Sequence, residues 1–131
     1  MNNPSVSTPL RIAAAQSPSV PGDVARNVLI HLAFVRVAAS EGVQVLLFPE
    51  LSLTGYELAA MPGLVMHADH ALLAPLREAA RRTGMAITVG APVESGGPLP
   101  SIGAITLRPD GRHSVYRKFH LHGSEVAFAT P

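Results

Sequence analysis

The sequence predicts an α/β fold built on parallel strands. The run Val43–Phe48 is almost continuously apolar, as is typical of a parallel strand that is covered on both faces. A helical pattern of apolar residues precedes this run, and a shorter apolar segment precedes the helix. Strand, helix and strand in this order imply a right-handed crossover between parallel strands.

The composition fits one globular domain that binds neither nucleic acid nor membrane. The 131 residues are 47% hydrophobic and 15% charged, and 10 Lys and Arg residues nearly balance 9 Asp and Glu residues. A net charge of +1 provides no electrostatic footprint for nucleic acid or for an anionic membrane. No apolar run approaches the roughly 20 residues of a membrane span, and the N-terminus lacks the basic and apolar regions of a secretory signal. We therefore expect a cytoplasmic protein with a polar, disordered tail at residues 1–9 and a domain at residues 10–131.

The N-terminal part of the domain predicts a strand and a helix. The strand is expected over Leu10–Gln16, where small apolar residues suit the close packing of helices over a sheet. Asp23 is placed to cap the helix, and Gly42 is placed to end it. Between them, apolar residues recur every three or four positions, at Val24, Val28, Leu32, Val35 and Ala39.

The middle of the chain predicts a second helix and a third strand. Residues 57–67 contain proline and glycine without a clear period, so we expect a loop that includes at most a turn of helix. Asp69 is expected to cap the second helix, which ends at Gly84 and carries its apolar stripe at Leu72, Leu73, Leu76, Ala79 and Ala80. A buried strand is expected over Met85–Gly90, and a surface loop from Pro92 to Pro100.

The C-terminal part changes to the pattern of a β-hairpin. Strand-like runs at Ile102–Leu107 and His113–Lys118 flank Pro109-Asp110-Gly111, which is a turn signal. The hairpin brings Lys118, the only lysine of the chain, to the end of the fifth strand.

Charged side chains stand at strand ends, where ligands of open α/β sheets bind. Glu50 follows the Val43–Phe48 strand, and Pro49, which lacks an N–H, ends the ladder just before it. This position makes Glu50 a candidate general base. Lys118 is a compact charge that can stabilise a developing oxyanion. A solvated glutamate and a solvated lysine fit the same pattern, and the sequence leaves that alternative open.

The histidines suggest a metal site as a further alternative. His120 and His122 alternate on one face of an extended segment, and His67 and His70 lie close together in the sequence. A metal site needs three or four ligands with partners behind them, and the spacing provides no third ligand. A metal-dependent hydrolase built on His120 and His122 is therefore the least favoured interpretation. Phosphate-binding and dinucleotide-binding glycine motifs are absent from the sequence.

With these features in place, the chain from Arg11 to Pro131 resembles the N-terminal part of a carbon-nitrogen hydrolase of the nitrilase superfamily. The resemblance rests on short motifs and on their order: Ala14-Ala15-Gln16, Leu47-Phe48-Pro49-Glu50 with Leu53-Thr54-Gly55-Tyr56, Pro109-Asp110-Gly111, and Tyr116-Arg117-Lys118-Phe119-His120-Leu121. It implies the N-terminal portion of a four-layer α-β-β-α sandwich, which this chain leaves incomplete.

The resemblance also implies roles for individual residues in a Glu, Lys and Cys triad. Glu50 matches the general base that takes the proton of the nucleophile, and Lys118 matches the lysine that stabilises the charged tetrahedral intermediate. Glu125, followed by Phe128 and Thr130-Pro131, resembles a second family glutamate that positions the substrate and the triad. The implied reaction is the hydrolysis of a small amide, carbamoyl compound or nitrile through a cysteine acyl-enzyme, without metal or organic cofactor. Family members commonly form homo-oligomers.

The sequence departs from the family in lacking the nucleophile. It contains no cysteine, which also excludes disulfides and thiolate metal sites, whereas the family cysteine lies well after the lysine. The first expectation is therefore an N-terminal fragment or a truncated gene product of a hydrolase, inactive on its own. The alternative is a non-catalytic remnant that binds a small molecule or pairs with a homologous subunit. Either form leaves sheet edges and apolar faces uncovered, which predicts low solubility or dependence on a partner chain.

Overall fold

The computed structural model describes residues 7–131. Residues 1–6 of the expected tail lie outside the described residues, and residues 7–9 are exposed and belong to no helix or strand. The elements, where η marks a short 3-10 helix, are β1 (Ile12–Ala14), α1 (Val24–Ser40), β2 (Val45–Leu47), η1 (Leu58–Gly63), η2 (Ala71–Leu73), α2 (Ala74–Thr83), β3 (Ala86–Val93), β4 (Ser101–Leu107) and β5 (His113–Arg117).

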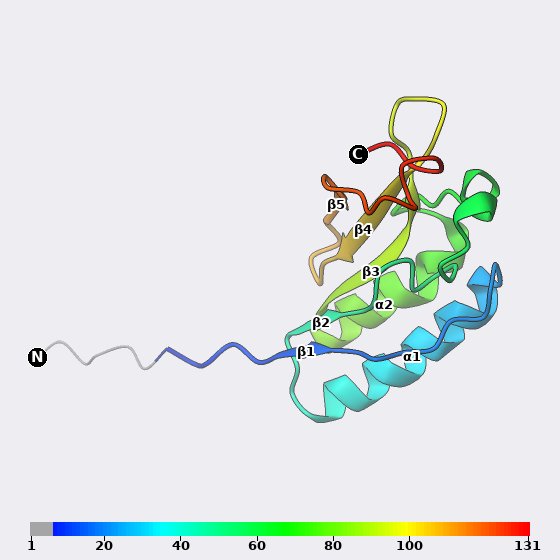
Figure 1. The fold of residues 1–131 in the computed structure, drawn as a ribbon. Helices are drawn as coiled ribbons and strands as arrows, with labels where there is room; N and C mark the ends of the chain where they lie inside the picture. The colour runs from blue at the N-terminus through cyan, green and yellow to red at the C-terminus, as the bar shows by residue number, and fades with distance from the viewer. Residues whose placement is uncertain (1–6) are drawn as a thin grey trace, which may run out of the picture.

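The strands form one mixed sheet in the order β1-β2-β3-β4-β5. Strands β1, β2 and β3 pair in parallel, whereas β3, β4 and β5 pair antiparallel. Figure 1 shows α1 and α2 on the same face of this sheet. The predicted α/β fold class is confirmed. No helix within residues 7–131 is both long and apolar enough to cross a lipid bilayer.

The main core lies between the helices and the sheet. Its members from the strands include Leu46, Ile87, Val89, Ile105 and Leu107. A smaller apolar cluster joins the turn after β2, η1, β4 and the C-terminal segment through Leu51, Met61, Ile102 and Ala129. The C-terminal segment is thereby packed onto the sheet close to the end of β2.

The opposite face of the sheet is only partly covered. The register places Ile12, Leu47 and Tyr116 on this face, and they are 63%, 42% and 66% exposed. Thr88 and Thr106 also lie there, with 2.9 Å between their hydroxyl oxygens. The sheet therefore presents apolar and hydroxyl side chains on the face that does not carry the α-helices.

Helix α1 begins and ends as predicted, but its buried stripe differs. Asp23 accepts a hydrogen bond from the Arg26 N–H at 3.0 Å, and Gly42 follows the helix with a φ of 70°. Leu32 and Ala39 are only partly buried, while polar and small side chains lie on the buried face. The buried residues of the helix are Val24, Asn27, Val28, His31, Val35 and Ala38.

The start of the second helix also differs from the prediction, because Asp69 does not cap it. His70 caps η2 instead, and its Nδ1 accepts from the Leu72 N–H at 3.1 Å. The α-helix starts only at Ala74 because Pro75 must lie in the first turn, where its missing N–H leaves no bond unmade. Gly84 ends the helix in the left-handed conformation, as predicted.

Strand β3 is longer than predicted, and the expectation of a loop beginning at Pro92 is wrong. The strand runs to Val93, with Pro92 opposite Ile102. The Pro92 carbonyl accepts from the Met66 N–H at 2.8 Å. The carbonyl and the nitrogen of Pro92 lie on the same edge of the strand, and that edge therefore faces Met66 and not β4. An N–H missing on that edge removes no hydrogen bond between β3 and β4, and the strand continues.

The first strands are shorter than predicted, whereas the hairpin is confirmed. Only Ile12–Ala14 and Val45–Leu47 pair regularly, because the Gln44 and Val45 N–H groups both donate to the Arg11 carbonyl and interrupt the ladder. The turn between β4 and β5 has Gly111 at a φ of 85°, the conformation that favours glycine.

Candidate functional site

Glu50 lies in a tight turn at the carboxyl end of β2. The Ser52 N–H donates to the Pro49 carbonyl at 3.1 Å, and the Gly55 N–H donates to the Leu51 carbonyl at 2.8 Å. Leu51 has a φ of 53°, in the left-handed region that residues other than glycine rarely adopt. Its side chain is fully buried. Packing therefore holds an uncommon backbone conformation directly beside Glu50.

Gly90 of β3 lets this turn approach the sheet. A Cβ atom at Gly90 would lie 2.4 Å from both the Leu51 nitrogen and the Pro49 oxygen. The Leu53 N–H donates to the Gly90 carbonyl at 2.9 Å, and the Gly90 N–H donates to the Ser52 hydroxyl at 3.0 Å. The turn that carries Glu50 thus rests directly on the β3 backbone.

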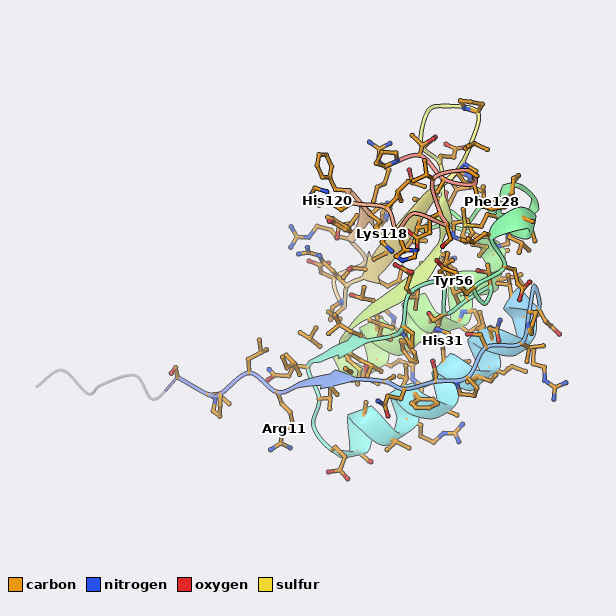
Figure 2. The ribbon with its side chains drawn as sticks, in the orientation of Figure 1. Arg11, His31, Tyr56, Lys118, His120 and Phe128 are labelled. Carbon is orange, nitrogen blue, oxygen red and sulfur yellow. The ribbon has the colours of Figure 1, made fainter. Side chains whose placement is uncertain are left out.

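Lys118 reaches the site from the end of β5. Its backbone N–H donates to the Ile102 carbonyl at 2.8 Å, so the pairing with β4 determines where the side chain starts. Its Nζ donates to Glu50 Oε2 at 2.8 Å and to Glu125 Oε1 at 3.0 Å. Figure 2 shows Lys118 and Tyr56 in the same region of the molecule. The structure therefore brings together all three residues that the sequence singled out.

Glu125 is the buried member of this cluster, with 1% of its side chain exposed. Its Oε1 accepts from the Tyr56 hydroxyl at 2.6 Å as well as from Lys118, and its Oε2 accepts from the His122 backbone N–H at 2.8 Å. A buried carboxylate is costly unless it is paired and hydrogen-bonded. Here each oxygen has at least one donor, which accounts for a charged group at this position.

These contacts shift the pKa values of the cluster. Burial acts to raise the pKa of Glu125, but the hydrogen bonds from Tyr56, Lys118 and the His122 N–H outweigh it and lower the pKa to about 2. The hydrogen bond to Glu50, followed by the one to Glu125, raises the pKa of Lys118. The pKa of Tyr56 is also raised, chiefly because its hydroxyl donates to the Glu125 carboxylate. At neutral pH the cluster therefore holds an ammonium, a buried carboxylate and a neutral phenol.

The carboxylates of Glu50 and Glu125 differ in what they can still bind. The Glu50 side chain is 40% exposed, and its Oε2 accepts from Lys118. Within residues 7–131, Glu50 Oε1 makes no hydrogen bond, whereas both oxygens of Glu125 are occupied. Glu50 is thus the carboxylate that can take up a proton from a bound molecule.

The histidines that suggested a metal site are engaged elsewhere. His120 packs edge-on against Phe119, with 4.8 Å between ring centroids, and Figure 2 shows it away from Tyr56. His122 Nδ1 lies 3.0 Å from the Ser124 hydroxyl. In the part of the chain that the structure describes, no three His, Asp or Glu side chains are grouped so that they could hold a metal ion.

Tyr56, whose hydroxyl contacts Glu125, was not among the residues predicted to form the site. Tyr56 ends the Leu53–Tyr56 motif, but no spacing rule relates it to a glutamate 69 positions later. The buried side chains of Asn27 and His31 were also missed. Their signal was present in the sequence, because both fall at helical spacing between the apolar residues Val24 and Val35.

Comparison with known proteins places this site in a family context. The family model described as carbon-nitrogen hydrolase matches residues 11–130. A glutamine-dependent NAD(+) synthetase of Xylella fastidiosa (strain Temecula1 / ATCC 700964) is 35% identical over 117 residues, which cover 86% of this chain and 21% of that protein. An aliphatic nitrilase of Sinorhizobium fredii (strain HH103) is 30% identical over 137 residues, covering 90% of this chain and 44% of the nitrilase.

Solved structures show the same architecture. The NitN amidase of Nesterenkonia sp. AN1 superposes with a TM-score of 0.78 at 29% identity, covering 93% of this chain and 49% of the amidase. XC1258 of Xanthomonas campestris, a CN-hydrolase superfamily protein with an arsenic adduct in its active site, superposes with a TM-score of 0.79 at 25% identity, covering 92% of this chain and 45% of its own. The chain thus spans about half the length of these structures and about a fifth of the synthetase.

Proposed function

Because this chain belongs to the carbon-nitrogen hydrolase family, we propose that it supplies the base and the charge-stabilising groups of a site that hydrolyses small amides or nitriles. The observation that carries the proposal is the bridge that Lys118 Nζ makes between Glu50 and Glu125, at 2.8 Å and 3.0 Å. The amidase and the nitrilase among its relatives support the same class of substrate.

The roles of Glu50, Lys118 and Glu125 follow from the chemistry of amides. Amides are poor electrophiles, so their hydrolysis needs an activated nucleophile, a base and a cation beside the developing oxyanion. Glu50 suits the base because it is partly exposed and has an oxygen available. Lys118 has a third ammonium hydrogen beyond its bonds to Glu50 and Glu125, and its raised pKa keeps it charged. Glu125, whose oxygens are occupied, holds Lys118 in place.

The nucleophile must come from outside these 131 residues, which contain no cysteine. In a glutamate-to-leucine mutant of the Nesterenkonia amidase, the acetamide moiety of fluoroacetamide adds covalently to the active-site cysteine. We propose that a thiol passes its proton to Glu50 as its sulfur bonds to the substrate carbonyl carbon. The amide nitrogen then leaves with that proton as ammonia, and water hydrolyses the thioester to release the acid and restore the thiol. On this proposal the 131-residue chain alone does not turn over.

The first experiment is to sequence the source DNA beyond the codon for Pro131. An open frame that continues into a strand and a cysteine-bearing turn supports the proposal. A stop codon at that point, with a protein of this length present in the cell, contradicts it.

Turnover in the longer form tests the assignment of the base. Glu50→Gln should lower ammonia release from small amides at least about 100-fold, because a general base contributes roughly that much or more. Glu57→Gln is the matched control, since Glu57 is an exposed glutamate of the same loop. A Glu50→Gln variant that kept its rate would refute the assignment.

A second candidate function is a pairing module without catalysis, which two observations favour. The sequence lacks cysteine, and the open sheet face exposes apolar side chains such as Leu47 and Tyr116. On this reading the purified chain self-associates or pairs with a homologous subunit. Sedimentation equilibrium of the 131-residue chain checks this: a stable monomer, together with ammonia release from the longer form, excludes the pairing module.

A further inference from the structure

Helix α1 carries buried polar side chains that the proposed reaction does not use. Asn27 and His31 both have 0% of their surface exposed. A buried polar group costs free energy unless it is hydrogen-bonded, so their partners show what these residues hold.

The hydrogen bonds of His31 define its tautomer and its partner. His31 Nδ1 lies 2.6 Å from the Asn27 carbonyl, which can only accept, so Nδ1 carries the proton. His31 Nε2 lies 2.8 Å from the Ser52 hydroxyl and must therefore accept from it. The same hydroxyl accepts from the Gly90 N–H at 3.0 Å. A chain of hydrogen bonds thus runs from α1 through Ser52 to β3.

The His31 ring also contacts the chain on the other side of Glu50. It stacks on the Phe48 ring with 4.0 Å between centroids and 29° between planes. Phe48 lies two residues before Glu50, and Ser52 lies two residues after it. His31 consequently holds the chain at both ends of the short segment that presents Glu50.

Asn27 reinforces this attachment one helical turn earlier. Its Nδ2 donates to the carbonyls of Leu53 and Val20, each at 2.9 Å, and its Oδ1 accepts from the Val20 N–H at 2.7 Å. Asn27 and His31 therefore bind consecutive residues of the turn, Leu53 and Ser52. Helix α1 is tied to this turn by hydrogen bonds as well as by apolar contact.

We infer that His31 is a positioning residue, which holds the Glu50 turn from behind and so sets where the Glu50 carboxylate meets Lys118. The catalytic importance of this position rests on the proposed function. The geometric claim does not, because it concerns only the contact between Glu50 and Lys118.

The single lysine provides a direct readout of that contact. Protein labelled with carbon-13 at the lysine Cε gives one side-chain signal, from Lys118, whose pH titration reports its pKa. The hydrogen bond to Glu50 is the largest cause of the raised pKa of Lys118. Glu50→Gln should therefore lower the Lys118 pKa and provide the reference for a lost contact.

His31→Leu should lower the Lys118 pKa in the same direction as Glu50→Gln. Val35→Ala is the matched control, because Val35 is a buried residue of α1 one turn further along. It should lower the melting temperature and leave the Lys118 pKa unchanged. His31→Gln, whose amide can still accept from the Ser52 hydroxyl, should keep the pKa closer to that of the native protein than His31→Leu does.

The inference is overturned if folded His31→Leu protein titrates like the native chain at Lys118. If His31→Leu does not fold, Ser52→Ala carries the same test, since it removes the partner of His31 from the turn. A lowered Lys118 pKa in a protein whose longer form releases no ammonia would refute the proposed function and leave this inference standing.

Discussion

Replacing Gly90 with alanine should push the Glu50 turn off the sheet. The added Cβ would lie 2.4 Å from Leu51 N and Pro49 O and 2.9 Å from the Glu50 carbonyl carbon. Unstrained contacts need about 3.5 Å, so the turn must retreat by about 1 Å. The obstruction is purely spatial, because Gly90 does not have the positive φ that favours glycine.

The cost follows from the contacts that such a retreat disturbs. Overpacking costs about 1–3 kcal/mol, and the upper part of this range applies because the obstructing atoms belong to the backbone. The retreat also breaks the bond from the Leu53 N–H to the Gly90 carbonyl and that from the Gly90 N–H to Ser52, worth about 1 kcal/mol each. Alanine recovers about 0.5–1 kcal/mol by restricting the unfolded chain. The expected loss in the free energy of unfolding is therefore roughly 3–4 kcal/mol.

Thermal unfolding followed by circular dichroism measures this loss. For a chain of this length, it corresponds to a fall in Tm of about 12 °C. Gly63→Ala is the matched control, because a Cβ there would meet no atom within 4 Å. The Lys118 pKa should fall in Gly90→Ala alone, since the retreat carries Glu50 away from Lys118. A Gly90→Ala protein as stable as Gly63→Ala, with an unchanged Lys118 pKa, would show that the turn does not rest on β3 as described.

Further predictions concern the ionisable groups Glu125 and Tyr56 of the site, and His31 behind the Glu50 turn. The pKa of Glu125 falls from an ordinary value of 4.5 to about 2 in the folded chain, so the unfolded chain binds more protons between these values. Glu125 therefore stabilises the folded chain fully above about pH 4.5, and this stabilisation is lost as the pH falls toward 2. Urea unfolding should show this fall in the free energy of unfolding for the native chain but not for Glu125→Gln. Tyr116→Phe leaves Tyr56 as the only tyrosine, and titration followed by ultraviolet absorbance should show a Tyr56 pKa above the ordinary 10.0. Adding Glu125→Gln should lower the Tyr56 pKa. An unchanged pKa would contradict the hydrogen bond from Tyr56 to Glu125. Burial lowers the pKa of His31 below 6.5, so the folded chain resists its protonation and loses stability as the pH falls through that value. The native chain should therefore exceed His31→Leu in free energy of unfolding by less as the pH falls through this range. A difference that stays constant from roughly pH 8 to pH 5 would show that His31 is not held neutral.

Local sequence signals predicted most of the architecture. Asp23 and Gly42 bounded α1 correctly, because capping and helix termination depend on a few neighbouring residues. The hairpin followed from its turn residues for the same reason. Strand ends were less well predicted, since pairing partners far along the chain determine where a ladder stops.

The errors at the second helix and at Pro92 had different causes. Asp69 had the right chemistry for a cap, but Pro75 and the turn η2 determined where the helix began. Pro92 was predicted to begin a loop, but its nitrogen lies on the edge of β3 that faces Met66, so its missing N–H removes no hydrogen bond to β4. Pro75 is visible in the sequence, so the first error lay in the interpretation of a local pattern, whereas the second depended on Met66, which lies 26 residues before Pro92.

The strand pattern of the sequence was enough to identify which charged residues stand at strand ends and therefore which could form the site. Glu50 and Lys118 were identified because strand periodicity is local, and Glu125 because it matched a family motif. The folded structure was needed to show that Tyr56 and the His122 N–H donate to Glu125, and that His31 contacts the chain on both sides of Glu50. Apart from the bond of the His122 N–H, which lies three residues before Glu125, these contacts join residues 17 to 69 positions apart. Their geometry depends on how helix, sheet and C-terminal segment pack together, which no spacing along the chain encodes.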